Sequence, residues 1–385
     1  MRIVIFCHSL RSDWNHGNAH FLRGVASELV HRGHDVRVFE PADAWSVQNL
    51  AAEHGSGALD ALFAAYPELA SAVHVYDRAS LVPDAAVESA DVVIVHEWSD
   101  ADLVSAIGAA RAKTDRFVLL FHDTHHRSIS DRVGIAANDL QHYDGVLAFG
   151  DVIRDAYLVN GWTHRAWTWH EAADARRFHP RSTDRLEGDL VWIGNWGDNE
   201  RTADIHEFLI QPVRRLGIRA RIYGVRYPPT ARRALADAGI EYGGWLPNYA
   251  AADVFGRFRV TVHIPRRPYL ESLPGIPTIR PFEALACGIP LVCARWRTTG
   301  GLFEPGRDFL VVDDGGEMAA TLARLLKDEG ERARLADHGR ATVIERHTCA
   351  HRVDELLAIV DEVRAGRMAL AHSVRGRGIV EQRAC

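Results

Sequence analysis

The sequence contains little lysine, few cysteines and no excess of positive charge. Only Lys113 and Lys327 among its 45 basic residues are lysine, and 51 acidic residues give a formal net charge of −6. Charges of both signs are spread along the chain, so a nucleic-acid partner is not expected. The cysteines are odd in number and widely scattered, which favours reduced core thiols over a disulfide framework. They are Cys7, Cys287, Cys293, Cys349 and Cys385.

The amino terminus has no long apolar segment. Its apolar run covers only residues 3–7, which is too short for the core of a signal peptide or for a membrane span. We therefore expect a cytoplasmic protein without a transmembrane segment. Peripheral contact with a membrane and the oligomeric state are left open by the sequence.

Three motifs of other enzyme classes are also missing. No Gly-x-Gly-x-x-Gly follows the first strand, which argues against a dinucleotide cofactor, and the clustered histidines lack the His-Glu-x-x-His pattern of zinc enzymes. No Asp-x-Asp stands at a convincing strand end to chelate a metal with a diphosphate. We expect no metal and no resident cofactor.

What the sequence does contain is a regular alternation of apolar runs with segments of helical period. This alternation is typical of parallel sheets with crossover helices, and 385 residues suffice for two such cores. Strands are predicted at 3–7, 36–39, 92–95, 117–121 and 146–149, then at 190–193, 220–223, 260–264, 291–294 and 309–312. The charged segment 171–189 is interpreted as a linker. Segment 41–90 is less regular, with one helix predicted at 59–65, and the tail from residue 366 is expected to be loosely ordered.

One segment, RPFEALACGIPLV at 280–292, combines a short helix with a following strand. Pro281 suits the first helical turn and Gly288 its end, so Glu283 lies near the helix start. A carboxylate there can accept two hydrogen bonds from a vicinal diol such as a ribose. The alternative is that Glu283 only complements the positive end of the helix dipole. The ribose interpretation requires the Glu283 carboxylate to face the cleft between the domains. It also requires that this carboxylate is not held in an internal ion pair.

This segment resembles the nucleotide-sugar signature of GT-B glycosyltransferases, and is most similar to the retaining family 4 enzymes and the CgeB-like branch. The resemblance implies an α/β chain with two Rossmann-like domains, at 1–175 on the acceptor side and 186–347 for the nucleotide sugar. A helix within 348–385 would cross back to the first domain. It also implies a metal-independent, hexosyltransferase-like enzyme that moves a sugar from a nucleotide-diphosphate sugar to an acceptor hydroxyl. One departure is that Gly275 stands where many family 4 enzymes carry a second glutamate.

Polar residues at the strand ends supply the candidate site, because ligands of open parallel sheets bind there. Histidine–acid pairs end two strands, and we expect His122, Asp123 and Glu97 to be catalytic, although each acid could instead cap a turn or shape the acceptor pocket. A loop for acceptor or donor is predicted from the small and polar residues before the first helix, where capping and turn formation are equally good explanations. Its residues are His16, Gly17 and Asn18.

Donor-binding residues are predicted mainly in the second half. Glycines before a helix can admit a diphosphate, and arginine forks match its charge. The predicted set is Gly194, Asn195, Arg201, Arg266, Pro277, Thr278, Arg280 and Glu283. Trp245 could contact the nucleobase or serve as buried packing.

Two other functions share this pattern. Sugar-nucleotide 2-epimerases have the same fold, so the architecture does not exclude an isomerase. A catalytically degenerate sugar-nucleotide-binding protein is the second alternative, and the glycine at position 275 favours it.

Overall fold

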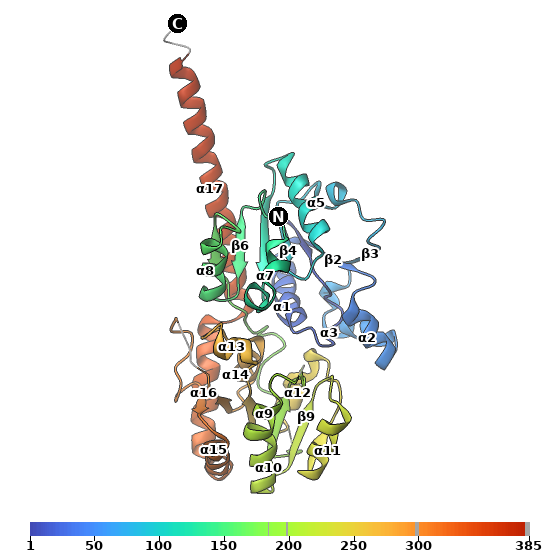
Figure 1. Ribbon diagram of the computed structural model, residues 1–385, viewed down its shortest axis with the longest axis vertical. Helices are drawn as coiled ribbons and strands as arrows, with labels where there is room; N and C mark the ends of the chain where they lie inside the picture. Colours follow the sequence, from blue (N-terminus) through green and yellow to red (C-terminus); the bar gives the residue numbers. More distant parts are fainter. Residues whose placement is uncertain (184, 198, 297–299, 382–385) are drawn as a thin grey trace.

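The computed structural model describes residues 1–183, 185–197, 199–296 and 300–381, and shows two α/β lobes stacked end to end (Figure 1). The first lobe contains a seven-stranded parallel sheet in the order β3-β2-β1-β4-β5-β6-β7. Its central strands are buried along their whole length, as the apolar runs predict for a parallel sheet covered on both faces. The strands are β1 (Arg2–Phe6), β2 (Asp35–Pro41), β3 (Val73–Tyr76), β4 (Val92–His96), β5 (Val118–Asp123), β6 (Gly145–Ala148) and β7 (Ala166–Thr168).

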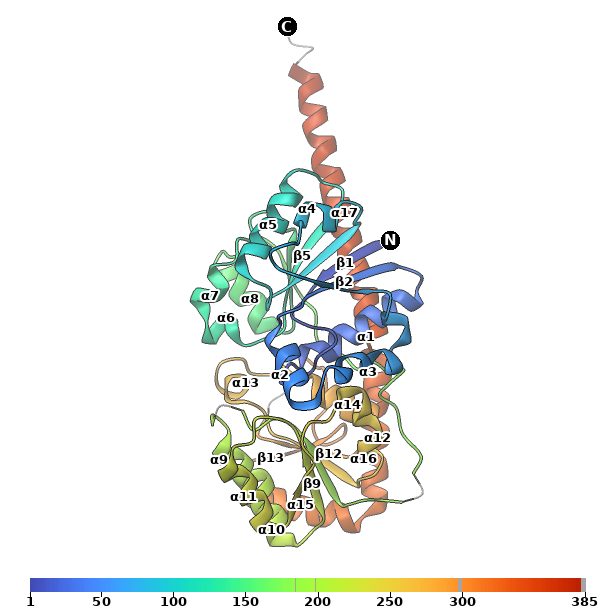
Figure 2. The same ribbon diagram turned by 90° about the vertical axis from the view of Figure 1, so that its right-hand side faces the viewer.

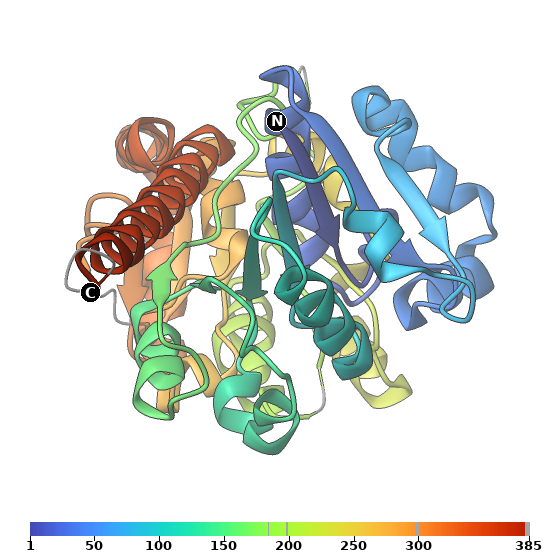
Figure 3. The same cartoon turned by 90° about the horizontal axis from the view of Figure 1, so that it is seen from above.

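The helices of this lobe cover both faces of the sheet (Figure 3). Helix α1 is the most buried of the longer ones and follows β1 directly through the loop at 7–17. The helices are α1 (Asn18–His31), α2 (Trp45–His54), α3 (Gly57–Ala65), α4 (Pro83–Val87), α5 (Ala101–Ala112), α6 (Arg127–Ser130), α7 (Arg132–Ala136) and α8 (Asp151–Val159), with a 3₁₀ turn at Pro67–Leu69.

The second lobe repeats the plan with a six-stranded parallel sheet in the order β10-β9-β8-β11-β12-β13. Its strands are β8 (Leu190–Ile193), β9 (Ala220–Tyr223), β10 (Ile240–Tyr242), β11 (Val260–His263), β12 (Leu291–Ala294) and β13 (Leu310–Val312). Its helices are α9 (Thr202–Ile205), α10 (Gln211–Leu216), α11 (Pro229–Asp237), α12 (Ala251–Phe255), α13 (Arg267–Glu271), α14 (Ile279–Ala286), α15 (Gly315–Lys327) and α16 (Glu329–Arg346). A π-helical turn at His206–Ile210 joins α9 to α10, and a 3₁₀ turn at Asn248–Ala250 precedes α12.

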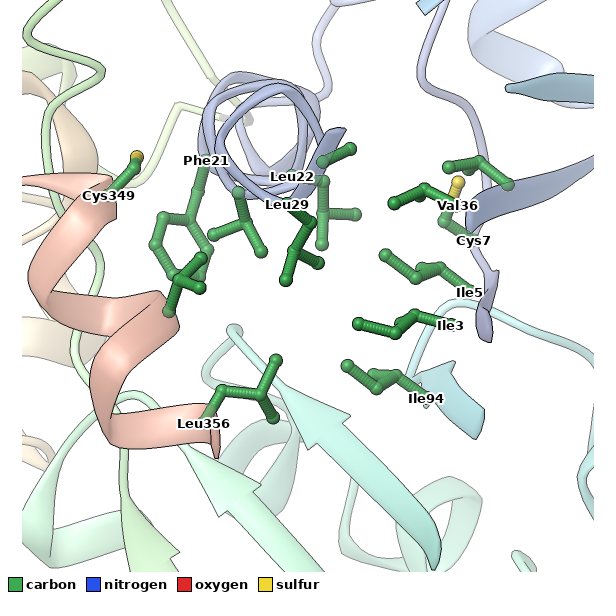
Figure 4. Close-up of a cluster of buried hydrophobic side chains, with 14 of the residues drawn as sticks. Ile3, Ile5, Cys7, Phe21, Leu22, Leu29, Val36, Ile94, Cys349 and Leu356 are labelled. Atoms are coloured by element: carbon green, nitrogen blue, oxygen red, sulfur yellow. The ribbon is translucent and has the colours of Figure 1, made fainter. Parts of the chain in front are cut away.

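The last helix, α17 (Cys349–Glu381), returns to the first lobe and packs beside α1 (Figure 4). Phe21 of α1 and Leu356 of α17 belong to the same buried apolar cluster as the strand residue Ile5. The two helices lie so close that a Cβ on Gly24 would be 2.5 Å from the Sγ of Cys349. The crossing helix expected from the GT-B resemblance is therefore present.

The sequence located most of the secondary structure and missed its less regular parts. The ten predicted strands correspond to observed ones within two residues at each end. The missed strands β3, β7 and β10 are short and incompletely buried, so they carry little apolar signal. The tail expected to be loosely ordered from residue 366 instead continues α17 to Glu381.

The remaining structural expectations concern cysteines and membranes. Cys7, Cys287, Cys293 and Cys349 are buried and form no disulfide, whereas Cys385 lies outside the described residues. Within the part of the chain that the structure describes, no helix is long and apolar enough to cross a bilayer.

Candidate functional site

A cavity of about 460 Å³ lies between the two lobes, where the carboxyl ends of both sheets meet. The first lobe contributes the loops after β1, β4 and β5 together with the start of α2, and the second contributes the loops after β8, β9, β10 and β11 and the start of α14. Figure 2 shows α2 at the junction, directly above the second lobe. This is where open parallel sheets place their ligands.

The loop after β8 forms part of the second lobe's wall of the cavity. Gly194 and Asn195 line the cavity, and Gly197 turns the chain with φ 84°, a conformation that favours glycine. The Asn195 side chain accepts from the backbone N–H of Val225 (2.9 Å) and donates to the Oδ1 of Asn15 in the other lobe (2.9 Å). The predicted donor loop is therefore on the wall and contacts both lobes.

Arg201, which precedes α9, is a buried cation on this wall. Its side chain donates to the carbonyls of Ile264 (3.0 Å) and Asn195 and lies over the ring of Trp192 at 5.4 Å. The residue is 9% exposed, and burial lowers the pKa of its guanidinium to about 10. The described residues place no carboxylate in an ion pair with it, and its Nε has no hydrogen-bond partner among them. A cation in this position is well suited to an incoming anion.

Three further arginines of the described chain line the cavity, all from the second lobe. They are Arg226, Arg266 and Arg280. Arg266 pairs with Glu200, and Arg280 pairs with Glu283. The carboxylates on the wall are Asp13 and Glu171. The second lobe therefore gives the cavity a strongly cationic side.

Glu283 is not on the wall. It is 1% exposed, and Arg280 Nη1 donates to its Oε2 at 2.6 Å while Asn248 Nδ2 donates to its Oε1 at 2.8 Å. His20 of the first lobe places its Nδ1 3.3 Å from the same Oε1. Burial by itself would raise the pKa of Glu283, but Arg280 and His20 lower it below the usual value.

This arrangement is the internal ion pair that the ribose hypothesis did not expect. As the structure stands, Glu283 positions Arg280, which does line the cavity, and a ribose contact would require Glu283 to exchange a partner. The condition set for the ribose contact is therefore not met in this structure, and the contact stays a prediction that needs this exchange. Thr278, directly before α14, lines the cavity as predicted, whereas Pro277 is buried behind it.

The predicted catalytic group also lies behind the cavity wall. His122 is fully buried, with its ring 4.8 Å from that of Trp169, and burial lowers its pKa to about 3. Asp123 accepts from the Tyr157 hydroxyl (2.8 Å) and from the backbone N–H of His125 (3.0 Å). Glu97 is 1% exposed and faces the guanidinium of Arg127 at 3.7 Å.

None of these three residues lines the cavity. They end or directly follow strands whose side chains are buried among the covering helices, so the wall begins only after them in the chain. Burial raises the pKa of Asp123 to about 6, and burial together with Asp123 raises that of Glu97 well above its usual value. Any catalytic role for them stays a prediction.

The residues that follow them form the first lobe's wall. Thr124, His125 and His126 line the cavity after β5, and Trp98 lines it after β4. The predicted loop residues His16, Gly17 and Asn18 also line it. Asn18 does not cap α1, because the helix has no side-chain cap at its start, and its Nδ2 instead lies 3.4 Å from the Nε2 of His96.

Trp45 and Glu171 are among the wall residues that sequence reasoning missed. Trp45 lies in the irregular segment 41–90, where no periodic signal pointed to it. Glu171 was assigned to the linker, but it lines the cavity at 3% exposure and accepts from the backbone N–H of Ile279. Burial, with a smaller contribution from Glu283, raises the pKa of Glu171 well above its usual value.

Asp13, an acidic residue of the first lobe, also joins the two lobes. Asp13 pairs with Arg23 (2.8 Å) and accepts from the Trp245 ring N–H (2.9 Å) and the backbone N–H of Asn248 (2.8 Å). Trp245 lines the cavity and is half-buried. Asn248 therefore bridges Asp13 and Glu283, and ties the two lobes together beside the cavity.

Two expectations from the sequence remain. One concerns a metal site and the other the missing second glutamate. Across residues 1–183, 185–197, 199–296 and 300–381, no group of three or more histidine, cysteine, aspartate or glutamate side chains is arranged to hold a metal ion. Gly275 is buried, does not line this cavity and has φ 84°. A glutamate there would be strained, which gives the departure from the family pattern a backbone cause.

Comparison with known proteins supports this geometry. Residues 201–358 match a family model described as glycosyl transferase-like, whereas a search of curated proteins finds no significant match. Anabaena HepE in complex with UDP and glucose superposes with a TM-score of 0.67 at 14% identity, covering 94% of this chain and 100% of that one. An alpha-glucosyltransferase in complex with UDP gives 0.68 at 13% identity, covering 94% and 100%.

Sucrose-phosphate synthase from Thermosynechococcus elongatus gives a TM-score of 0.64 at 14% identity, covering 95% of this chain and 100% of that one. These similarities cover 94% or more of the chain and so confirm the predicted GT-B fold. The narrower resemblance to family 4 and the CgeB-like branch stays a prediction. The chain therefore has the GT-B fold, and residues 201–358 of its second lobe and last helix are similar to a glycosyl transferase-like family.

Proposed function

We propose that this protein transfers a sugar from a nucleoside diphosphate sugar to an acceptor hydroxyl. The observation that carries the proposal is Arg201, a buried guanidinium on the cavity wall that is held by two carbonyls and by no carboxylate of the described chain. Such a site gains most from an anion, and a diphosphate supplies the oxygen pattern that a guanidinium matches. Arg280, Arg266 and the start of α14 lie on the same wall.

In the reaction, the bond between the anomeric carbon and the diphosphate oxygen breaks, and a bond from the acceptor oxygen to that carbon forms. The departing nucleoside diphosphate gains negative charge, which the arginines stabilise in place without reorganisation. The acceptor proton leaves to a base. Asn195, Asp13 and His20 contact the opposite lobe and help to close the cavity, which excludes water from the reacting sugar.

UDP-glucose is the first donor to test, because similar structures contain UDP or UDP-glucose. Calorimetric titration with UDP, GDP and ADP should show saturable binding of at least one, and the matching nucleotide sugar should raise the melting temperature. Incubation with an acceptor panel should then yield a glycosylated product by mass spectrometry, in EDTA as well as without it. Failure to bind any nucleotide or nucleotide sugar would overturn the proposal.

The backbone at Gly275, whose φ of 84° disfavours a second glutamate, favours one alternative, a binding protein without transferase activity. In that case nucleotide sugar would bind and raise the melting temperature, but neither transfer nor hydrolysis would be detected with any acceptor. The same titration and product assay separate the two functions.

A further inference from the structure

The first lobe's wall of the cavity presents two tryptophans. Trp45 at the start of α2 and Trp98 after β4 both line the cavity and are half-buried, with ring centroids 6.3 Å apart. Arg127 lies over the Trp98 ring at 5.1 Å, and His8 packs against Trp45 at 4.6 Å. The neighbouring groups therefore hold both rings in place at the lobe junction, where Figure 2 shows α2.

Three histidines of the same wall carry ring nitrogens that the protein leaves unsatisfied. These are Nε2 of His16, Nδ1 of His125 and Nε2 of His126, none of which has a hydrogen-bond partner among the described residues. His16 is 3% exposed and His126 is 8% exposed. Buried polar atoms normally have a partner. Burial lowers the pKa of all three rings, so each is a neutral imidazole that can donate or accept a hydrogen bond.

The charges on the two walls differ. Among the described residues, the arginines that line the cavity all belong to the second lobe, and they are Arg201, Arg226, Arg266 and Arg280. On the described part of the first lobe, the only charged carboxylate that lines the cavity before the linker is Asp13, and Arg23 neutralises it. An anionic ligand is therefore matched by the second lobe, and a neutral polar ligand by the first.

We propose that Trp45, Trp98, His16, His125 and His126 form the acceptor subsite and that the acceptor is a neutral saccharide. The inference rests on the proposed function. The faces of aromatic rings are electronegative and attract the weakly positive C–H groups of one sugar face. The hydroxyls at the sugar's rim then satisfy the three imidazoles. A purely apolar acceptor would leave those nitrogens unpaired, and an anionic one finds no arginine or lysine among the described first-lobe residues that line the cavity.

The test uses the full chain saturated with UDP and a panel of neutral disaccharides comprising maltose, cellobiose and lactose. Binding is measured by saturation-transfer NMR and calorimetry. We expect at least one disaccharide to bind and Trp98→Ala to weaken it at least tenfold, with UDP affinity unchanged within twofold. In turnover assays the same variant should raise the acceptor KM more than it lowers kcat. Trp45→Phe, which keeps an aromatic face, should retain most of the affinity.

Trp162→Ala is the matched control. Trp162 is a half-buried tryptophan of the same lobe, packed against Tyr157 and away from the cavity, and its replacement should leave disaccharide affinity within twofold. If Trp98→Ala does not fold, His125→Ala replaces it and should weaken the disaccharide at least fivefold.

The outcomes separate the two proposals. Absence of UDP binding contradicts the proposed function itself. UDP binding without any disaccharide binding overturns the acceptor inference alone, and so does selective binding of a flat aromatic phenol such as 4-nitrophenol. Equal effects of Trp98→Ala and Trp162→Ala on disaccharide affinity also overturn it, because the wall would then act only through general stability.

Discussion

The two walls of the cavity are built by the same kind of fold and differ in chemistry. Each wall consists of loops at the carboxyl ends of a parallel sheet. The second lobe's wall carries the lining arginines, including the buried Arg201. The first lobe's wall carries neutral histidines beside Trp45 and Trp98.

This difference teaches that the sheets fix where ligands lie, while the loops decide what is bound. A cationic wall opposite a neutral wall fits a reaction in which one substrate carries a diphosphate and the other does not. It also means that substitutions on the two walls should affect different substrates.

The largest expected effect concerns the pair that supports the cationic wall. Glu283→Gln removes the charge that balances Arg280, and breaking such a buried pair should lower the free energy of unfolding by about 3 kcal/mol. Urea denaturation measures it, with Glu271→Gln on exposed α13 as the control. If Glu283 instead contacts the ribose, the opposite result is expected, unchanged stability with lost nucleotide binding. That result would restore the ribose contact and make the internal pair incidental.

The next effect tests the wall itself. Arg201→Met keeps an unbranched side chain over Trp192 but removes the charge, and should weaken UDP binding about 100-fold, or about 2.7 kcal/mol. Stability without ligand should not fall, because an unpaired buried cation is costly to the fold. Arg214→Met, at an exposed position of α10, is the control for calorimetry and melting. An equal loss of UDP affinity in both variants would mean that the overall positive potential of the second lobe, and not Arg201 itself, attracts the diphosphate.

Apolar periodicity indicates where strands and helices lie, and this limits how much of the site the sequence could predict. The apolar runs located the strands and, through them, the loops with Gly194, Asn195 and Arg201. They did not show which strand-end side chain faces the cavity. His122 and Asp123 are the last residues of β5 and are buried, whereas His125 and His126 come after the turn and are on the wall.

Contacts between the lobes were beyond prediction for a different reason. His20 meets Glu283 across 263 positions of sequence, and Asn248 meets Asp13 across 235. No local pattern encodes such a pairing, so the sequence suggested an open carboxylate where the fold makes a buried one. Trp45 was missed because its segment has neither strand nor helix periodicity strong enough to place it.

The next smaller effect concerns Asp123, one of the buried acidic residues behind the first lobe's wall. Burial raises the pKa of Asp123 from 3.8 to about 6, so the folded protein holds this proton more tightly than the unfolded chain. That stabilisation is complete below about pH 4 and is lost as the pH rises through 6, by about 3 kcal/mol in all, of which about 2 kcal/mol falls between pH 4 and 7. Asp123→Asn, which can still accept from Tyr157, should lack this loss when melting temperature is followed from pH 4 to 7.

If the melting temperatures of Asp123→Asn and of the unaltered protein change with pH in the same way, Asp123 is ionised over the whole pH range and exposed to solvent. The variant also tests catalysis. Retention of kcat within about threefold would place Asp123 in a structural role behind the wall, whereas a loss of about 100-fold or more is typical of a removed general base.

The smallest effect sharpens the comparison at the position where many family 4 enzymes, which the sequence resembles, carry a second glutamate. Gly275 has φ 84°, so Gly275→Ala should lower the free energy of unfolding by about 1 kcal/mol. Gly330→Ala, at an exposed position in the first turn of α16, should be neutral or slightly stabilising, because the helix accepts alanine readily. Opposite signs in urea denaturation would show that the backbone turn, and not only the lost side chain, keeps an acid from this position. Equal signs would mean that the turn relaxes, and Gly275→Glu would then be the variant in which to look for altered transfer.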